Sequence, residues 1–530
     1  MIGITVKKEY WDNFKVEEDD LDFIYSLLLE TEIPQTIDEI LYSLISYRLK
    51  QEKLRLEQQQ KNIGSVYIPK DDYQVGQTLF FPALDMKTAE IINIRRGFNP
   101  DIDEFKVLEV SFPTGEKKFF AASLENHILN QPEIMDENQP DVDVNSIIET
   151  YGTLIKEILI AELESNPDLV RIGFTWFPKA LLVNVNVGYL NLAEALIEME
   201  GGIPLPTGKI LDQIDLPTDV NKKLTEFSLN YALQDDERFD EVGPAGEILW
   251  CLNRLEPDYV RELPRYLAYQ PVEYNLESIQ PSLNTFISSI NDELEPEITP
   301  AETPEKIQIS LIYPHIQSGT LPLTARMKKI FPTAIQSPRV RFTFVDGNSQ
   351  QRFSGWVVRS SHYIGGLKEW YQKNNVIPGS LLNLQSGKIP GEVIIRVEQK
   401  RSTKDWIRTA LIGADGGIVF AMLKQPISTA IDERMAVFIS DQDALEKVWV
   451  GNKGKKVSLE KKIKETMRDL SRLNPQGHVH ALEIYAALNV SQRYPPGPIF
   501  CMLLEKPWVI PIGDLYFRLQ EIESEENTSG

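Results

Sequence analysis

Apolar residues near the start of the chain recur with the period of an α-helix. They lie three or four positions apart at Ile37, Ile40, Leu41, Leu44, Ile45 and Leu49. This spacing indicates a helix with one buried face, and Thr36 with Glu39 forms a capping-box pattern at its start. We therefore predict a helical N-terminal region over residues 1–62. It either packs as a lead into the next domain or serves a helix-turn-helix or partner-binding role.

The period changes to that of short strands between Tyr73 and Leu124. Four or five alternating runs follow one another in about fifty residues, with a turn at Thr114-Gly115. The run VGQTLFFPALDMKTAEIINI resembles the opening of the SH3-like or Tudor-like barrels of CarD- and KOW-type transcription-coupling proteins, with Asp85 and Met86 where that pattern often has Gly. We expect a small SH3-like β-barrel over residues 63–130.

The middle of the chain returns to helical spacing. Residues 141–290 contain apolar helical runs such as VNSIIETYGTLIKEILIAEL and YLNLAEALIEMEGG, and we predict an acidic helical domain there. No repeat of fixed period marks a solenoid. The stretch NDELEPEITPAETPEK, at residues 291–306, has acidic and proline residues and no aromatic residue, so we place a linker at 291–310.

Strand patterns dominate residues 311–440. Two alternating runs flank the turn Asp346-Gly347-Asn348-Ser349, GGLKEWYQ predicts a short helix, and two more strands follow. This order resembles the B-three pseudobarrel DNA-binding domain of plant transcription factors and some restriction enzymes. The likeness is carried by Gly366, Leu367, Trp370, Asn374, Pro378, Gly379 and Leu381. The resemblance implies a pseudobarrel whose basic strand residues and loops face DNA.

Further strands and a helical segment complete the chain. WIRTALI and IVFAML flank GADGG, which we interpret as a hairpin turn because no helix follows it as a phosphate loop requires. Residues 451–520 predict three helices and a hairpin, resembling a winged helix of the HARE type found in bacterial polymerase-associated and restriction-linked proteins. The matching positions are His480, Leu482, Ile484, Tyr485, Gly513, Asp514, Tyr516, Arg518 and Leu519. Residues 521–530 form an acidic tail.

Together these patterns predict a multidomain α+β fold. Its parts are N-terminal helices and a small β-barrel, an acidic helical middle, a β-pseudobarrel-like domain and a C-terminal winged helix. The 530 residues are too many for one core. No apolar run is long enough for a membrane helix and no signal or transit pattern opens the chain, so we expect a cytoplasmic protein without membrane partners.

Charge is distributed unevenly along the chain. The net charge is -23, but residues 131–310 hold 34 acidic and 11 basic residues, whereas residues 321–430 hold 16 basic and 6 acidic residues. Residues 451–520 sum to +5. The charge of each segment indicates possible binding partners better than the net charge of the whole chain does. This distribution suits a basic segment that binds duplex DNA, or a protein interaction scaffold in which the basic segment docks on acidic segments of this chain or of a neighbour.

Catalytic and metal-binding patterns are sparse. Cys251 and Cys501 are the only cysteines, which excludes a disulfide framework or a cysteine zinc cluster, and we expect no metal or cofactor. Asp85 with the Glu104-Phe105-Lys106 triplet is the one pattern suited to a Mg²⁺-dependent nuclease. His478 and His480 suit capping or surface roles, and no Ser, His and Asp set has a hydrolase context. We expect a non-enzymatic protein, with the nuclease kept as a second alternative.

The nucleic-acid interface is expected in the basic C-terminal half. Strand alternation places Arg339 and Arg341 on one face, and Arg352 and Trp356 on one face of the return strand. Aromatic residues interleave with basic ones in this segment, a combination typical of nucleic-acid binding. The candidate contacts are Lys328, Lys329, Arg339, Arg341, Arg352, Trp356, Arg359, Lys368, Lys373, Lys453, Lys455, Lys456, Lys461 and Lys462. The family resemblances imply a transcription- or defence-related role in bacteria.

Overall fold

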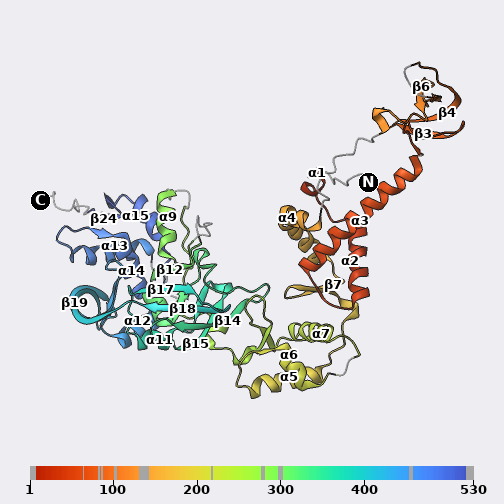
Figure 1. Cartoon of the computed structure of the whole chain (residues 1–530). Helices are drawn as coiled ribbons and strands as arrows, with labels where there is room; N and C mark the ends of the chain where they lie inside the picture. Colours follow the sequence, from red (N-terminus) through yellow and green to blue (C-terminus); the bar gives the residue numbers. More distant parts are fainter. Residues whose placement is uncertain are drawn as a thin grey trace. The chain divides into compact units, whose positions relative to one another are not determined.

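The computed structural model shows a mixed α+β protein, as the sequence predicts. It describes residues 8–63, 65–81, 84, 87–100, 104–130, 143–216, 219–275, 281–295, 303–452 and 458–520. The chain divides into two compact units (Figure 1). The first comprises Met1–Leu182 and Asp219–Phe227, and the second comprises Val183–Thr218 and Ser228–Gly530.

Helices build most of the first compact unit. They are α1 (Lys8–Asp12), α2 (Glu18–Thr31), α3 (Ile37–Ile63) and α4 (Val144–Ser165), with strands β1 (Gln35–Thr36), β7 (Leu169–Ile172) and β8 (Thr175–Pro178). The predicted capping box is confirmed: Glu39 Oε2 accepts from the Thr36 N–H at 2.7 Å, and Thr36 Oγ1 accepts from the Glu39 N–H at 3.3 Å. The apolar face that follows is buried at Ile40, Leu44 and Ile45.

A five-stranded sheet is inserted between α3 and α4. Its strands are β2 (Ser65–Val66), β3 (Thr78–Phe81), β4 (Lys87–Arg96), β5 (Lys106–Ser111) and β6 (Lys117–Ala122), in that order across the sheet. Alternating residues such as Leu79, Phe81 and Ile91 form its core. The predicted strands are present, and Asp85 and Met86 lie outside the described residues.

The second compact unit opens with a helical segment that carries a small sheet. Its elements are α5 (Val187–Met199), β9 (Leu205–Pro206), α6 (Thr207–Ile214), β10 (Phe239–Glu241), β11 (Leu249–Leu252) and α8 (Asp258–Arg261), together with the part of α7 (Lys222–Gln234) from Ser228 onward, since the residues up to Phe227 belong to the first compact unit. Trp250 is buried in its core, where its indole N–H donates to Asn230 Oδ1 at 2.9 Å. The expected domain 141–290 is therefore divided, because α4 belongs to the first compact unit and α5 to the second.

A seven-stranded sheet forms the centre of the second compact unit. Its order is β12 (Lys306–Ser310), β17 (Leu381–Ser386), β18 (Glu392–Val397), β14 (Arg339–Asp346), β15 (Arg352–Val358), β16 (Tyr363–Gly365) and β13 (Thr320–Pro322). All pairs are antiparallel except β14 with β18. The predicted hairpin β14–β15 and the short helix α11 (Lys368–Lys373) are present. Gly366 has φ +105°, and a Cβ there would lie 2.5 Å from the Ser354 carbonyl oxygen, so this turn requires glycine.

The C-terminal part adds a long hairpin and a second helical segment. The hairpin is β19 (Gln399–Ile412) and β20 (Ile418–Thr429), with β21 (Phe438–Ile439) beside β19. The helical segment contains α12 (Gln442–Asn452), α13 (Leu459–Ser471), β22 (Val479–His480), α14 (Ala481–Ser491), α15 (Pro496–Glu505), β23 (Val509–Gly513) and β24 (Tyr516–Leu519). The three helices and hairpin predicted for residues 451–520 are thus observed.

Three segments share one order of elements, which sequence analysis did not detect. Each has a helix, a short strand, two helices and a hairpin whose last strand pairs with the short strand. We call them modules: the first is α2-β1-α3-α4-β7-β8, the second α5-β9-α6-α7-β10-β11 and the third α13-β22-α14-α15-β23-β24. The matching pairs are Thr36 with Thr175, Leu205 with Trp250 and Val479 with Phe517. The five-stranded sheet interrupts only the first module.

The region expected as a linker has structured ends. Asp292 and Glu293 are buried, and residues 306–310 are strand β12 of the central sheet, while 296–302 lie outside the described residues. The helix α9 (Pro281–Ile290) contributes Ile287 to the core that contains the third module. The described residues on both sides of 296–302 are therefore part of the folded second compact unit: α9 packs in the core of the third module, and β12 is a strand of the central sheet.

Candidate nucleic-acid interface

The predicted basic face of the hairpin β14–β15 exists but is covered. Arg341 pairs with Trp356, and Arg352 with Val345, so the arginines and the tryptophan share one face of the sheet. Trp356 is only 4% exposed, because it packs with Val242 and Cys251. The prediction that this face is open to nucleic acid is therefore wrong for Trp356.

Arg339 on this face is held by two carboxylates. Its Nη1 donates to Asp240 Oδ2 and to Glu256 Oε2, each at 2.7 Å. Burial, followed by the charge of Asp240, raises the pKa of Glu256 to about 7, and Arg339 opposes this rise. Both carboxylates belong to the acidic segment 131–310. Charge complementarity between the two segments is thus satisfied, at this point, inside the second compact unit.

The other arginines predicted for this interface also have protein partners. Arg341 Nε donates to Ser354 Oγ at 3.0 Å, and Arg352 forms an ion pair with Glu392. Arg359 Nη1 donates to the carbonyl oxygens of Ala334 and Ser337. These contacts fix the guanidinium groups against the protein surface. These hydrogen bonds and ion pairs give each arginine a role within the protein that requires no nucleic acid.

The predicted lysines are distributed over several places. Lys368 Nζ donates to the Gln317 carbonyl at 2.5 Å, and Lys373 Nζ to Gln351 Oε1 at 2.6 Å. Both lysines line a pocket of about 340 Å³ with Trp370. Two further predicted lysines, Lys328 and Lys329, are exposed on the loop after β13. Lys461 and Lys462 lie on α13, and the Nζ of each is 3.9 Å from a carboxylate oxygen of Glu465. Lys453, Lys455 and Lys456 lie outside the described residues.

The hairpin β19–β20 provides an open surface that the candidate set missed. Trp406 on β19 is 63% exposed, and its cross-strand neighbour Lys424 places its Nζ 5.4 Å from the centroid of the indole ring. The other tryptophans of the chain, all within the described residues, are buried or half-buried. The Trp406 ring is therefore the one indole of the described residues that is available to a partner.

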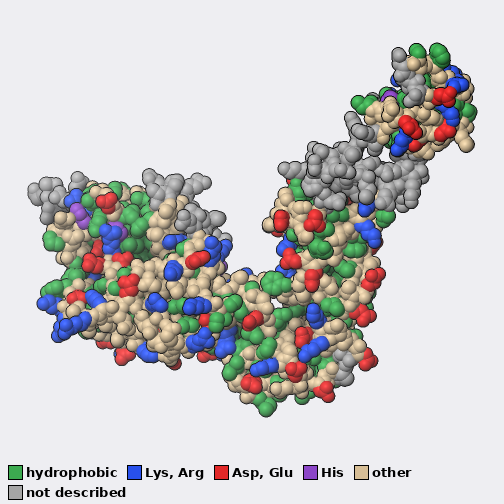
Figure 2. Space-filling view, in the orientation of Figure 1, with side chains coloured by type: hydrophobic (Ala, Val, Ile, Leu, Met, Phe, Trp, Pro, Cys, Tyr) green, Lys and Arg blue, Asp and Glu red, His purple; other side chains and the backbone are tan. Residues whose placement is uncertain are grey.

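Basic side chains share the hairpin with this tryptophan. Lys400, Arg401, Lys404 and Lys424 are all exposed on the hairpin. The only nearby carboxylate of β19, Asp405, forms an ion pair with Lys400 at 2.6 Å. Figure 2 shows Lys and Arg side chains gathered over the part of the second compact unit where Figure 1 labels β19. We call these four residues and Trp406 the hairpin patch.

The other half of the hairpin is anchored in the protein. Arg408 is buried; it donates to the carbonyl oxygens of Arg434 and Ala436 at 3.2 Å and pairs with Glu483 of α14. The segment Gly413–Gly417 forms the turn, as predicted, and the Gly417 N–H donates to Asp415 Oδ1 at 3.0 Å. The patch is thus presented from a fixed base.

The third helices of the first and third modules lack a basic surface. In a DNA-binding helix-turn-helix, one helix enters the major groove. Here α4 carries one lysine and four glutamates, and α15 carries one glutamate and no lysine or arginine. Most of α15 is also buried. These two modules therefore do not offer their third helices to DNA, whereas the hairpin patch is accessible.

The nuclease pattern is not assembled by the described residues. Glu104 forms an ion pair with Arg96, and Lys106 pairs with Asp72 at 2.6 Å, while Asp85 lies outside the description. Among residues whose positions are given, no group of three or more His, Cys, Asp or Glu is arranged to hold a metal ion. His480 instead caps α14, since its Nδ1 accepts from the Leu482 N–H at 3.1 Å. This agrees with the predicted capping role.

Comparison with known proteins gives no relative for this chain. No family model, no curated protein and no solved structure matches it. Within the described ranges, no helix is both long enough and apolar enough to span a membrane.

Proposed function

We propose that this is a cytoplasmic, non-enzymatic DNA-binding protein that contacts DNA through the hairpin patch. The observation that carries the proposal is the exposed Trp406 flanked by Lys404 and Lys424 on a hairpin anchored by Arg408. Lysine and arginine neutralise phosphates, and this electrostatic contribution dominates affinity for nucleic acid. An exposed indole adds a face on which a base or sugar can stack.

The shape of the element supports duplex DNA as the ligand. The major groove of B-DNA admits a two-stranded β-ribbon, and β19–β20 is such a ribbon, with exposed residues on both strands. The sequence resemblances to CarD-type, B-three and HARE-type proteins support a transcription- or defence-related role. The modules then serve as supports or as docking surfaces for partner proteins.

A titration of the full chain tests the proposal. We expect labelled duplex DNA to bind at low salt, and Trp406→Ala to weaken binding, because the variant loses the apolar contact of the indole with sugars and thymine methyl groups in the groove. The matched control is Lys388→Ala, an exposed lysine on the loop between β17 and β18, away from the hairpin. Fluorescence anisotropy measures both. Equal affinities for wild type and Trp406→Ala would contradict the proposed contact, and a preference for single strands would contradict groove binding.

A protein interaction scaffold is the second candidate function. It is favoured by the ion pairs of Arg339 with Asp240 and Glu256, which join the basic segment to the acidic one. In that case the hairpin patch docks on an acidic protein surface. Failure of the full chain to bind duplex or single-stranded DNA at low salt, together with retained folding, would favour this candidate.

A further inference from the structure

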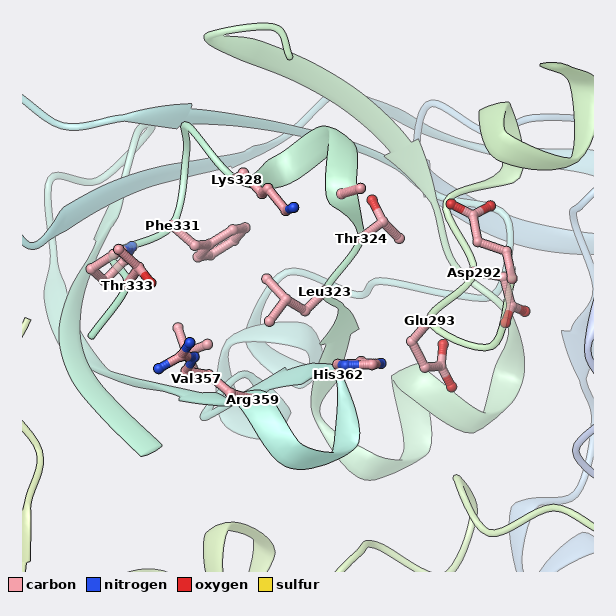
Figure 3. Close-up of a pocket in the computed structure, with 13 residues that line it drawn as sticks. Asp292, Glu293, Leu323, Thr324, Lys328, Phe331, Thr333, Val357, Arg359 and His362 are labelled. Atoms are coloured by element: carbon pink, nitrogen blue, oxygen red, sulfur yellow. The ribbon is translucent and has the colours of Figure 1, made fainter. Parts of the chain in front are cut away.

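A pocket of about 470 Å³ lies in the second compact unit, at a place distinct from the hairpin patch. Its apolar wall includes Leu323, Phe331 and Val357. Its size is within the range of small-molecule sites, which combine apolar walls with a few convergent polar groups. Figure 3 shows its lining residues around a common space.

Three cationic or protonatable side chains line this pocket. They are Lys328, Arg359 and His362, and Figure 3 shows Lys328 on one side with Arg359 and His362 on the other. Arg359 is held by the carbonyls of Ala334 and Ser337. The Lys328 ammonium forms no hydrogen bond or ion pair with the described residues. The pocket thus has one fixed guanidinium and one ammonium with free donors.

Two polar groups in the lining have no partner among the described residues. Thr324 is only 6% exposed, and its Oγ1 is buried without a hydrogen bond. Glu295 Oε2 is likewise buried and unpartnered. Buried polar groups in folded proteins are nearly always hydrogen-bonded, and an unsatisfied one is costly. Their presence in the same pocket points to a ligand that completes these bonds.

The acidic residues of the lining leave a positive balance. Asp292 and Glu293 share one cation, Arg493, at 2.6 and 2.9 Å, and Glu293 also contacts His315, so the one negative charge left over is outnumbered by Lys328 and Arg359. Burial, followed by the charge of Asp292, raises the pKa of Glu295 to about 8, while Glu293 acts in the same direction and Arg326 opposes it. The Glu295 carboxyl is therefore largely protonated at neutral pH and able to donate a hydrogen bond. The net charge of the side chains that line the pocket is therefore positive.

We propose that this pocket binds a small phosphomonoester whose phosphate contacts Lys328 and Thr324 and whose organic group lies on Leu323, Phe331 and Val357, toward Arg359 on the other side. Phosphate is favoured over carboxylate because its several oxygens can accept from the ammonium and from the unpartnered threonine hydroxyl together. This site is independent of DNA binding by the hairpin patch. It gives the protein a small-molecule ligand.

Calorimetric titration of the full chain with phenyl phosphate tests the proposal. We expect binding, with weaker binding of inorganic phosphate and none of phenol. Lys328→Gln should weaken phenyl phosphate binding by about tenfold, as for loss of one charge-assisted hydrogen bond, and Thr324→Val should weaken it by a smaller factor. The matched control Lys329→Gln changes the exposed neighbouring lysine, which does not line the pocket, and should leave affinity unchanged.

The pH dependence adds a second readout. Affinity should fall as pH rises through about 8, because Glu295 then ionises beside the anion, and Glu295→Gln should remove that fall. Absence of phenyl phosphate binding to the folded wild-type chain would overturn the proposal. So would equal weakening by Lys328→Gln and Lys329→Gln, or benzoate binding as tightly as phenyl phosphate.

Discussion

Arg493 is the residue on which two buried acids depend. Its Nη2 contacts Asp292 at 2.6 Å and Glu293 at 2.9 Å, and all three side chains are at most 2% exposed. Removing one partner of a buried ion pair costs about 3 to 5 kcal/mol, because the remaining charge is left without a partner. We expect Arg493→Met to lower the stability of the second compact unit by this amount in calorimetric unfolding.

A surface arginine provides the control. Arg472→Ala removes a pair with Asp469 at 3.6 Å whose arginine side chain is 70% exposed, and such a pair contributes about 1 kcal/mol or less. A similar loss of stability for both variants would contradict the role assigned to Arg493.

Arg339 is expected to serve stability, in contrast to its predicted role as a nucleic-acid contact. Arg339→Met leaves Asp240 and Glu256 without their shared donor, so the melting temperature should fall. Affinity for DNA should stay unchanged, because the face that carries Arg339 packs inside the protein. Anisotropy and calorimetry on the same sample separate the two effects. If the folded variant lost affinity for DNA, the face that carries Arg339 would be part of the DNA interface, which would contradict this expectation.

Individual site residues were only partly predictable from sequence. Strand alternation correctly placed Arg339 and Arg341 on one face. It could not show that Val242 and Cys251, about a hundred positions upstream, cover Trp356 on that face, because such packing is not local. For the hairpin patch a local signal existed in the run QKRSTKDW, where three basic residues precede a tryptophan.

At the level of elements, the N-terminus of α14 should respond to acid. His480 caps this helix as a neutral imidazole, and burial, followed by the charge of Arg434, lowers its pKa to about 4. In the unfolded chain a histidine has a pKa of about 6.5. Between these two pKa values the unfolded state binds more protons than the folded state. The contribution of His480 to the free energy of unfolding is therefore fully present above about pH 6.5 and is lost as the pH falls toward 4.

The variant His480→Asn isolates this contribution. Asparagine is a good N-cap that does not titrate in this range, so the melting temperature of the variant should fall less than that of wild type between pH 7 and pH 4.5. Absolute stability is not the readout, since the imidazole also contacts the Tyr516 ring at a centroid distance of 4.9 Å. Parallel pH curves for the two proteins would contradict the assignment.

Elements were predicted well where a local rule determines them. The capping box at Thr36 and Glu39 and the turn after Asp346 depend on neighbouring residues and are present. The three modules were missed, since their likeness lies in the pairing of strands far apart in sequence and not in a shared residue pattern. An insertion of five strands in the first module hides the likeness further.

For the whole molecule, the division of the chain into acidic and basic segments was visible in the sequence. Which basic residues are paired with acidic ones in the fold was not. Part of the positive charge of residues 321–430 is paired with acidic residues of 131–310, as Arg339 shows. The hairpin patch keeps Arg401, Lys404 and Lys424 open to solvent. A fragment starting at residue 311 would lose Tyr266 and Ile287 from the C-terminal core. DNA binding must therefore be measured on the complete chain.

The most direct test is the salt dependence of duplex DNA binding by the complete chain. Each phosphate neutralised contributes a slope of about -0.9 in log affinity against log salt. Changing Lys400, Arg401, Lys404 and Lys424 together to Gln should therefore flatten the slope by about 3 to 4 units while calorimetry shows the fold intact. Absence of binding by the wild-type chain at low salt, or the same slope for both proteins, would contradict DNA binding through the hairpin patch.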